Sequence, residues 1–339
     1  MAGTLTYVES LRRTLHQLMH ENPDVVVLGE DLLDPYGGAF KVTKGLSTHF
    51  PERVLATPIC EASIIGVATG MALFGIRPIA EIMFGDFMTL AADQLVNHAT
   101  KYRSMYGEEV SVPLVVRTPM GGGRGYGPTH SQSLEKLFLG IPNLTVVAPS
   151  HFHDPGDFLR RASAAEAPVL FVENKLLYPR ALRLDGEMGS LRRSEVSNGS
   201  GFPSVVLKNY EAPQRADVAV ITYGGISRLL EPALQWLTRE EIRVVVCVVG
   251  ALNPLDTDHI LDCASESQRV LIIEEGTCPF GWGAEVSAQI YDEMYDTLKA
   301  PLKRVGALDT VIPAAKTLED QVLVSEETII TAVLELIQW

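Results

Sequence analysis

Over the first half of the chain, segments with apolar residues at helical spacing alternate with short continuous apolar runs. Thr6–Met19 carries apolar residues at helical spacing, which predicts an amphipathic helix. Val25–Leu28 is an unbroken apolar run closed by a glycine, and it predicts a strand buried on both faces. Further strands are predicted at Arg53–Ala56, Pro78–Met83, Val112–Arg117, Thr145–Ala148 and Val169–Glu173, and further helices at Glu61–Phe74, Met88–Met105, between residues 117 and 145, and at Asp154–Ala165. This order predicts a parallel sheet covered by helices.

The pattern lapses between Leu182 and Gln214, where glycines lie among Ser, Asn and Arg, and this composition predicts a linker with a short excursion of strand. A second series then predicts strands at Asp217–Thr222, Arg243–Val249 and Val270–Glu274, and helices at Ser227–Leu237, Asp258–Glu266, Gly283–Thr297 and Thr328–Ile337. We therefore expect an α/β protein of two domains, each a mainly parallel sheet with helices on both faces. The expected domains are residues 1–185 and 215–339, joined by a linker of residues 186–214.

Composition and charge narrow the functional classes. The formal net charge of −14 argues against nucleic acid and against an anionic membrane surface as partners, because both attract basic proteins. Charges at Glu9 and Arg12 interrupt the N-terminal segment, so we expect no signal peptide. No apolar run approaches the ~20 residues of a membrane span. A soluble cytoplasmic protein is the expectation, and the widely spaced cysteines predict neither a zinc site nor a disulfide framework.

Glu61 is the first candidate for chemistry. It stands at the start of a predicted helix, where a carboxylate is often only a solvated residue stabilised by the helix dipole. Its neighbours favour burial instead, because Ile59 is apolar and Gly66 and Gly70 allow close approach of another backbone. Burial favours the neutral acid and the helix N-terminus favours the carboxylate, so the sequence leaves the protonation state open.

The second candidate is the segment GGGRGYGPTHSQS at residues 121–133. Its glycines suit either a phosphate cradle or a flexible surface loop, and it lacks the Gly-Lys-Ser/Thr of a P-loop. His130 ends the glycine-rich stretch. Loops after parallel strands carry ligands in open α/β sheets, and a histidine there can transfer protons near neutral pH.

Phe87 and Glu30 also follow predicted strands. Phe87 is suited either to the core or to a ligand site, and Glu30, beside Asp31, is suited either to a solvated turn or to the same site. The shared position of all these residues at strand ends favours a common site.

Several stretches together carry a resemblance to a known family. They are LGED at 28–31, TPICEASIIGVATG at 57–70, RPIAEIMFGDFMTLAADQLVNHATKYR at 77–103, THSQS at 129–133, FVENKLLY at 171–178, ITYGG at 221–225 and GWGAEV at 281–286. The chain resembles the beta subunit of the decarboxylating component of 2-oxo acid dehydrogenase complexes, in the transketolase-like superfamily. The resemblance covers nearly the whole chain in the family's order.

The resemblance implies a pyrimidine-binding domain followed by a smaller assembly domain, with thiamine diphosphate as cofactor. Glu61 matches the catalytic glutamate that hydrogen-bonds the aminopyrimidine ring, and Phe87 matches the aromatic residue that stacks on that ring. His130 matches a histidine that transfers protons near the reacting carbon. Glu30 and Ile59 match positions lining the cofactor cleft.

Two departures from the family's pattern concern a cation and the substrate. Residues 164–167 read Ala-Ala-Glu-Ala and lack the aspartate that holds potassium in some members, which puts a potassium site in doubt. Gly85 and Asp86 replace the residues often found before the stacking phenylalanine, which puts the substrate pocket in doubt.

The family's magnesium and diphosphate segment, Gly-Asp-Gly, does not occur in this sequence. The resemblance therefore implies that this chain supplies no metal ligand and that an alpha subunit holds magnesium and diphosphate. We expect a heterotetramer of two alpha and two beta chains, with active sites at the alpha–beta interfaces.

Several functions remain open. The first is decarboxylation of a 2-oxo acid with transfer of the acyl group to a lipoyl domain of an acyltransferase. Others are acetoin cleavage, transfer of a two-carbon ketol unit to a lipoyl or acyl carrier protein, and a scaffold that has lost catalysis. The joint presence of Glu61, Phe87 and His130 argues against the scaffold.

Overall fold

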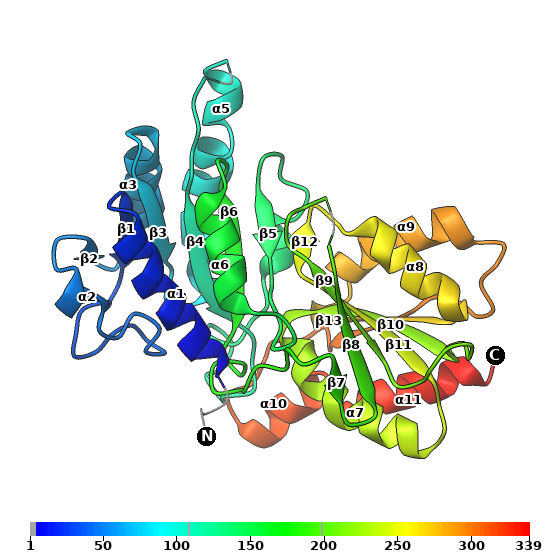
Figure 1. Ribbon diagram of the computed structural model, residues 1–339. Helices are drawn as coiled ribbons and strands as arrows, with labels where there is room; N and C mark the ends of the chain where they lie inside the picture. Colours follow the sequence, from blue (N-terminus) through cyan, green and yellow to red (C-terminus); the bar gives the residue numbers. More distant parts are fainter. Residues whose placement is uncertain (1–4, 108, 198) are drawn as a thin grey trace.

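The computed structural model describes residues 5–107, 109–197 and 199–339, and they form two α/β units side by side (Figure 1). The strands of the first sheet, in spatial order, are β12 (Ala251–Asn253), β5 (Thr145–Val147), β6 (Val169–Asn174), β4 (Val115–Met120), β3 (Arg77–Glu81), β1 (Val25–Gly29) and β2 (Val54–Ala56). All neighbours are parallel except β12, which runs antiparallel to β5. The predicted strands and their parallel arrangement are confirmed.

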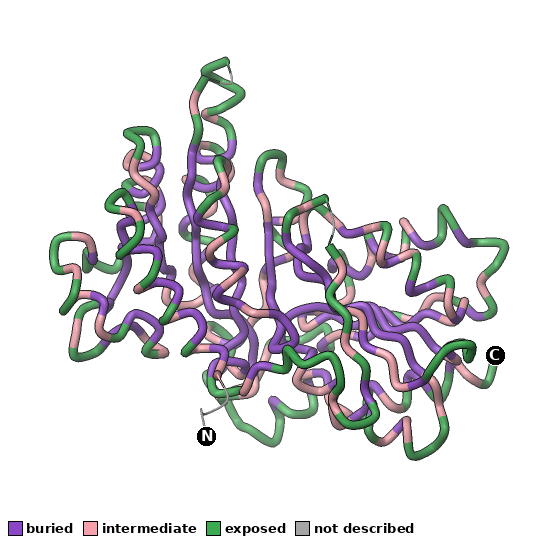
Figure 2. Tube along the Cα trace, in the orientation of Figure 1, coloured by how far each residue is buried: buried purple, intermediate pink, exposed green. Residues whose placement is uncertain are grey.

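Successive residues of the strands face opposite layers of helices. Val27 of β1 packs in the core with α1 (Tyr7–Glu21) and α6 (Pro155–Ala164), whereas its neighbour Leu28 packs in the core with α3 (Glu61–Leu73) and α4 (Met88–Asp93). The strands are therefore buried on both sides (Figure 2), as continuous apolar runs predict. Helix α1 begins with a capping box in which Thr6 and Glu9 satisfy each other's backbone N–H groups.

Two predicted helices differ in the structure. The helix expected over Met88–Met105 is divided into α4, a π-helical segment η2 (Gln94–Ala99) and α5 (Tyr102–Met105). The division arises because the Thr100 N–H bonds to the Leu95 carbonyl, five residues back, at 3.1 Å. Between β4 and β5 the only helical turns in the described chain are those of the 3₁₀ segment η3 (Glu135–Phe138), since the preceding glycines adopt conformations incompatible with a helix.

The second sheet extends into the expected linker. Its order is β14 (Lys303–Ala307), β13 (Val270–Thr277), β10 (Val218–Tyr223), β11 (Val244–Val249), β9 (Ser204–Lys208), β8 (Leu191–Val196) and β7 (Glu187–Met188). In residues 187–208, where a linker with a short excursion of strand was expected, β9 pairs antiparallel with β11, β8 with β9 and β7 with β8, so these residues extend the second sheet. The sheet is mixed, with its parallel half as predicted. Strands β12 and β14 and helix α10 (Lys316–Val322) were not predicted.

Helices also cover both faces of the second sheet. One face packs against α7 (Ser227–Arg239) and α11 (Glu326–Ile337), and the other against α8 (Thr257–Ser267) and α9 (Trp282–Met294). The layer of α8 and α9 shares one continuous core with the α3 and α4 layer of the first sheet. The two units are therefore fixed to each other by apolar packing. No helix in the described part of the chain is long and apolar enough to cross a membrane.

Candidate functional site

The candidate residues gather at the carboxyl edge of the first sheet. Strands β2, β1, β3, β4 and β6 are neighbours and run parallel, so the segments that follow them meet at one edge. These segments contribute Glu61, Glu30, Phe84 to Phe87, the loop that ends at His130, and Lys175. The residues predicted from strand ends therefore lie along one edge of the sheet.

Glu61 and Glu30 form a pair of buried carboxyl groups. Glu61 is the first residue of α3 and is 5% exposed, and Glu30 directly follows β1 and is 6% exposed. Burial and then the charge of Glu61 raise the pKa of Glu30. The Oε1 atom of Glu30 is buried without a hydrogen-bond partner in the described chain. Buried polar atoms are usually hydrogen-bonded, so this carboxyl oxygen is free to bind a ligand that enters the site.

His130 lies between two phenylalanines. Its ring centroid is 4.8 Å from that of Phe84 and 5.1 Å from that of Phe87, and both contacts are edge-on. Phe84 and Phe87 are themselves 6.3 Å apart. Of the predicted site residues, the structure brings Phe87 and His130 into contact, and Glu61 makes no hydrogen bond to His130 in the described residues.

The backbone around His130 is fixed by buried polar groups. The Nζ atom of Lys175 donates to the His130 carbonyl at 2.5 Å, and Asp86 accepts from the side-chain amide of Gln132 at 2.8 Å. Burial lowers the pKa of Lys175 to about 8, although the charges of Asp86 and Glu275 oppose this shift. Asp86, one of the departures from the family's pattern, thus supports the histidine segment.

Ile59 differs from the other predicted site residues. Its side chain is 82% exposed, whereas Glu61 two positions later is buried. In this chain alone, therefore, Ile59 does not line an enclosed cleft.

A buried ion network that the sequence analysis did not identify lies in the sheet beside the site. Arg117 is 1% exposed and bonds Glu81 at 2.7 Å and Glu173 at 2.7 Å. Tyr178 donates to Glu173 at 2.7 Å, and its ring stacks on Phe40, which contacts Phe84. The network links the centre of the sheet to the rings around His130.

The glycine-rich segment, for which a phosphate cradle was one interpretation, binds a side chain of the protein itself. Gly123 and Gly125 donate their N–H groups to the carboxylate of Glu319, which comes from α10 in the second unit. These donors are therefore occupied by a carboxylate of the chain itself. Nothing near the glycines in sequence predicts Glu319.

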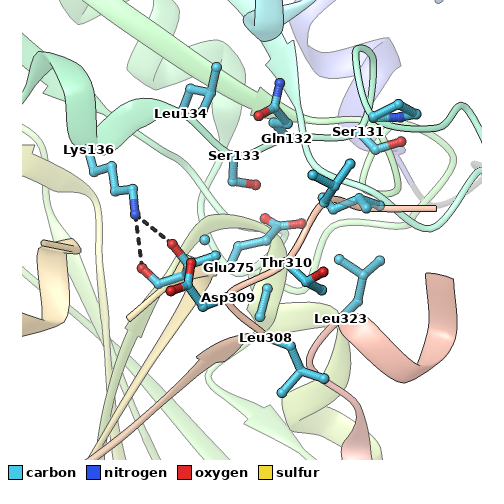
Figure 3. Close-up of a pocket in the computed structure, with 16 residues that line it drawn as sticks. Ser131, Gln132, Ser133, Leu134, Lys136, Glu275, Leu308, Asp309, Thr310 and Leu323 are labelled. Carbon is cyan, nitrogen blue, oxygen red and sulfur yellow. Dashed lines mark hydrogen bonds between the residues drawn. The ribbon is translucent and has the colours of Figure 1, made fainter. Parts of the chain in front are cut away.

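A cavity of about 530 Å³ lies between the two units, beyond the His130 loop (Figure 3). Ser131 to Leu134 form one wall, and Glu275 and the segment Ala307–Ile312 form others. Lys136 points toward Thr277 and donates to its Oγ1 atom at 2.7 Å, so its charge is engaged by the protein. Pro128 and Ser131, on either side of His130 in the sequence, line the cavity, but His130 and Glu61 do not.

No group of three or more His, Cys, Asp or Glu side chains in the described residues is arranged to hold a metal ion. Glu166, the acid in the segment considered for potassium, forms an ion pair with Arg77.

Comparisons with known proteins agree with this architecture. The model of the transketolase pyrimidine-binding domain matches residues 3–180, and that of the transketolase C-terminal domain matches residues 209–329. A solved structure described as a split gene transketolase, an inactive beta4 tetramer, superposes with a TM-score of 0.72 over 99% of both chains at 20% identity, which supports the fold. The fold and the two family models thus define a transketolase-like protein.

Named relatives narrow the family. The chain is 34% identical to the beta subunit of acetoin:2,6-dichlorophenolindophenol oxidoreductase of Cupriavidus necator, over 98% of this chain and 97% of that one. It is 34% identical to the 2-oxoisovalerate dehydrogenase subunit beta of Bacillus subtilis, over 99% and 100%. It is 33% identical to the mitochondrial pyruvate dehydrogenase E1 subunit beta-1 of Arabidopsis thaliana, over 98% and 89%. The chain belongs to the transketolase-like family that contains these beta subunits, as its motifs predicted.

Proposed function

We propose that this chain is the pyrimidine-binding half of a thiamine-diphosphate enzyme that decarboxylates a 2-oxo acid and passes the acyl group to a lipoyl domain. The observation that carries this proposal is the buried pair Glu30 and Glu61 at the carboxyl edge of the first sheet, with an unpaired carboxyl oxygen on Glu30. Membership of the beta-subunit family supports the same reaction class.

The residues of this chain fit the cofactor's pyrimidine half. Glu61 would hydrogen-bond the ring, Phe87 would stack on it, and Glu30 and Ile59 would line its cleft. When bound, thiamine diphosphate supplies a carbon nucleophile and an electron sink for decarboxylation. Glu61 would offer its buried carboxyl group as the hydrogen-bond partner of that ring, and His130 would move a proton at its imidazole during acyl transfer.

The second half of the site would come from an alpha subunit. Helix α3 supports this partner, because Val67 is 56% and Leu73 is 36% exposed on a helix whose other face is already in the core, and Phe74, which directly follows the helix, is 91% exposed. A helix that is apolar on both faces is buried in the finished assembly. The missing Gly-Asp-Gly segment supports magnesium and diphosphate binding by that alpha subunit. We propose two alpha and two beta chains, with residues 1–185 as the pyrimidine-binding domain.

The test uses the alpha–beta complex with thiamine diphosphate and magnesium. Pyruvate, branched 2-oxo acids, acetoin and ketose phosphates are supplied in turn, with an artificial electron acceptor and with a lipoyl domain. Labelled carbon dioxide from a 2-oxo acid, with acylation of the lipoyl domain, is the expected result. Turnover of acetoin or a ketose phosphate without carbon dioxide release would overturn the proposed substrate class.

A further inference from the structure

The loop Gly121–Gly127 closes around a carboxylate from the other unit of the protein. Glu319 of α10 is fully buried, and it accepts hydrogen bonds from Gly123 N at 2.8 Å and from Gly125 N at 2.9 Å. Each bond uses a different carboxylate oxygen, so the whole anion is engaged. Hydrogen bonds to an ionised group are shorter and stronger than neutral ones.

The glycines give the loop the shape that this contact needs. Gly121, Gly123, Gly125 and Gly127 have φ values of +91°, +88°, +70° and +78°, alternating with residues of ordinary conformation. Alternation of this kind turns backbone N–H groups toward a common concavity, which binds anions. The sequence suggested a cradle for phosphate, and the structure fills that concavity with Glu319.

The loop and the second unit also approach too closely for most side chains. A Cβ atom on Gly122 would lie 2.8 Å from the Leu323 side chain, and one on Gly125 would lie 3.2 Å from the Ala314 carbonyl. At Gly125 the positive φ and the nearby carbonyl both disfavour a side chain, so the contact between the two units depends on the glycine backbone there as well as on Glu319.

The same loop ends at His130. Lys175 holds the His130 carbonyl and Asp86 holds Gln132, and both belong to the first unit. Glu319 is the charged contact that the second unit makes upstream in the loop. The loop is thus hydrogen-bonded on both sides of the histidine. The contact before His130 comes from Glu319, almost 200 residues later in the sequence.

We propose that Glu319 is a positioning residue for His130: by fixing Gly123 and Gly125, the second unit sets the place of the imidazole in the active site. The proposal rests on the proposed function, in which His130 transfers a proton. It assigns the second unit a part in catalysis besides assembly.

The test compares Glu319→Gln with Asp320→Asn in the alpha–beta complex. Gln keeps the size of the side chain and loses the charge. Asp320 is the adjacent, exposed acid on α10 and pairs with Lys316, which also lies 4.0 Å from Glu319, so Asp320→Asn removes a neighbouring charge without removing the contact with the loop. Hydrogen exchange of the peptide spanning residues 121–130 is measured by mass spectrometry, together with kcat, KM and the melting temperature.

For Glu319→Gln we expect exchange in that peptide to rise about tenfold and kcat to fall about tenfold, with KM within about twofold of the wild type. Asp320→Asn should leave all three unchanged. Gly125→Ala, which strains the loop from its own side, should reproduce the effect of Glu319→Gln.

Unchanged exchange in Glu319→Gln would overturn the proposal, as would increased exchange with kcat unaltered. If kcat fell while KM rose and the melting temperature dropped as well, Glu319 would have only a structural role, and the proposal would be contradicted. If the wild-type complex turned over none of the substrates, the proposed function would fail, and His130 positioning with it. The exchange measurement would still report separately whether Glu319 holds the loop.

Discussion

His130 packs edge-on against Phe84, with ring centroids 4.8 Å apart and planes at 76°. Edge-to-face packing favours one orientation of each ring. Because Phe84 also contacts Phe40 and Tyr126, its own position is fixed from three sides. The imidazole therefore sits against a ring that cannot easily move.

Replacing Phe84 should reduce turnover through His130. In Phe84→Ala we expect kcat of the alpha–beta complex to fall about tenfold or more, because the histidine loses its packing surface. Phe280→Leu, on an almost fully exposed phenylalanine of the second unit, is the control and should keep wild-type kcat. Equal kcat in Phe84→Ala and the wild type would contradict a role for this ring.

Removing Arg117 should destabilise the protein more than removing a surface arginine. Arg117→Met leaves Glu81 and Glu173 buried without their cation, and loss of one partner from a buried network costs about 3–5 kcal/mol. Arg160→Met breaks a surface pair with Glu21 and should cost less than about 1 kcal/mol. Denaturant unfolding of the complex measures both, and equal losses would contradict the buried network.

Stability should depend on pH through Glu135. Burial raises the pKa of this carboxyl to about 7, while Tyr223 donates to it and Lys136 lies near; the charge of Glu275 adds to the rise. The folded state therefore holds a proton that the unfolded state releases near pH 4.5. Its contribution to stability is complete below that pH and is lost as the pH rises through 7.

Glu135→Gln mimics the protonated acid, so its stability should fall less steeply between pH 4.5 and 7 than that of the wild type. At pH 8 the variant should exceed the wild type by up to about 3 kcal/mol. Glu274, whose pKa is also raised to about 7 by burial, should leave part of the slope in place. Denaturation curves of the complex across this range measure the effect, and identical slopes would contradict it.

A charge on the exposed face of α3 should prevent assembly. In Val67→Asp we expect the chain to fold, since Val67 is 56% exposed, but to elute without its alpha partner. Tyr295→Asp, at an exposed aromatic residue after α9, should still assemble. Size-exclusion chromatography of the co-expressed chains distinguishes these outcomes, and a normal complex with Val67→Asp would place the interface elsewhere.

Local sequence predicted the parts of the fold that depend on local pattern. Val25–Leu28 and Val244–Val249 are continuous apolar runs, and each forms a fully buried strand in the interior of its sheet. Residues 187–196 are mostly polar, so strands β7 and β8 have no local signal, and the short apolar run of β9 indicates only a brief strand. They form because β9 finds a partner in β11, which is a contact between distant segments.

The site residues likewise fall into those that the sequence predicted and those whose roles depend on contacts between distant segments. The family motif and its place at strand ends predicted Glu61, Phe87 and His130. Phe84 and Lys175 lie inside motif stretches, yet their roles depend on contacts that only the fold makes. Glu319 has no local signal, because its partners Gly123 and Gly125 are almost 200 residues away.

The most direct test of the central proposal replaces the buried glutamate at the start of α3. Glu61→Ala and Glu61→Gln are assembled with the alpha subunit, thiamine diphosphate and magnesium, beside the exposed control Glu52→Ala. Release of labelled carbon dioxide from the preferred 2-oxo acid is then measured. We expect both Glu61 variants to assemble and to lose about a hundredfold or more in rate, with Glu52→Ala unaffected. Near-normal release from the Glu61 variants would contradict its role as the cofactor's proton partner.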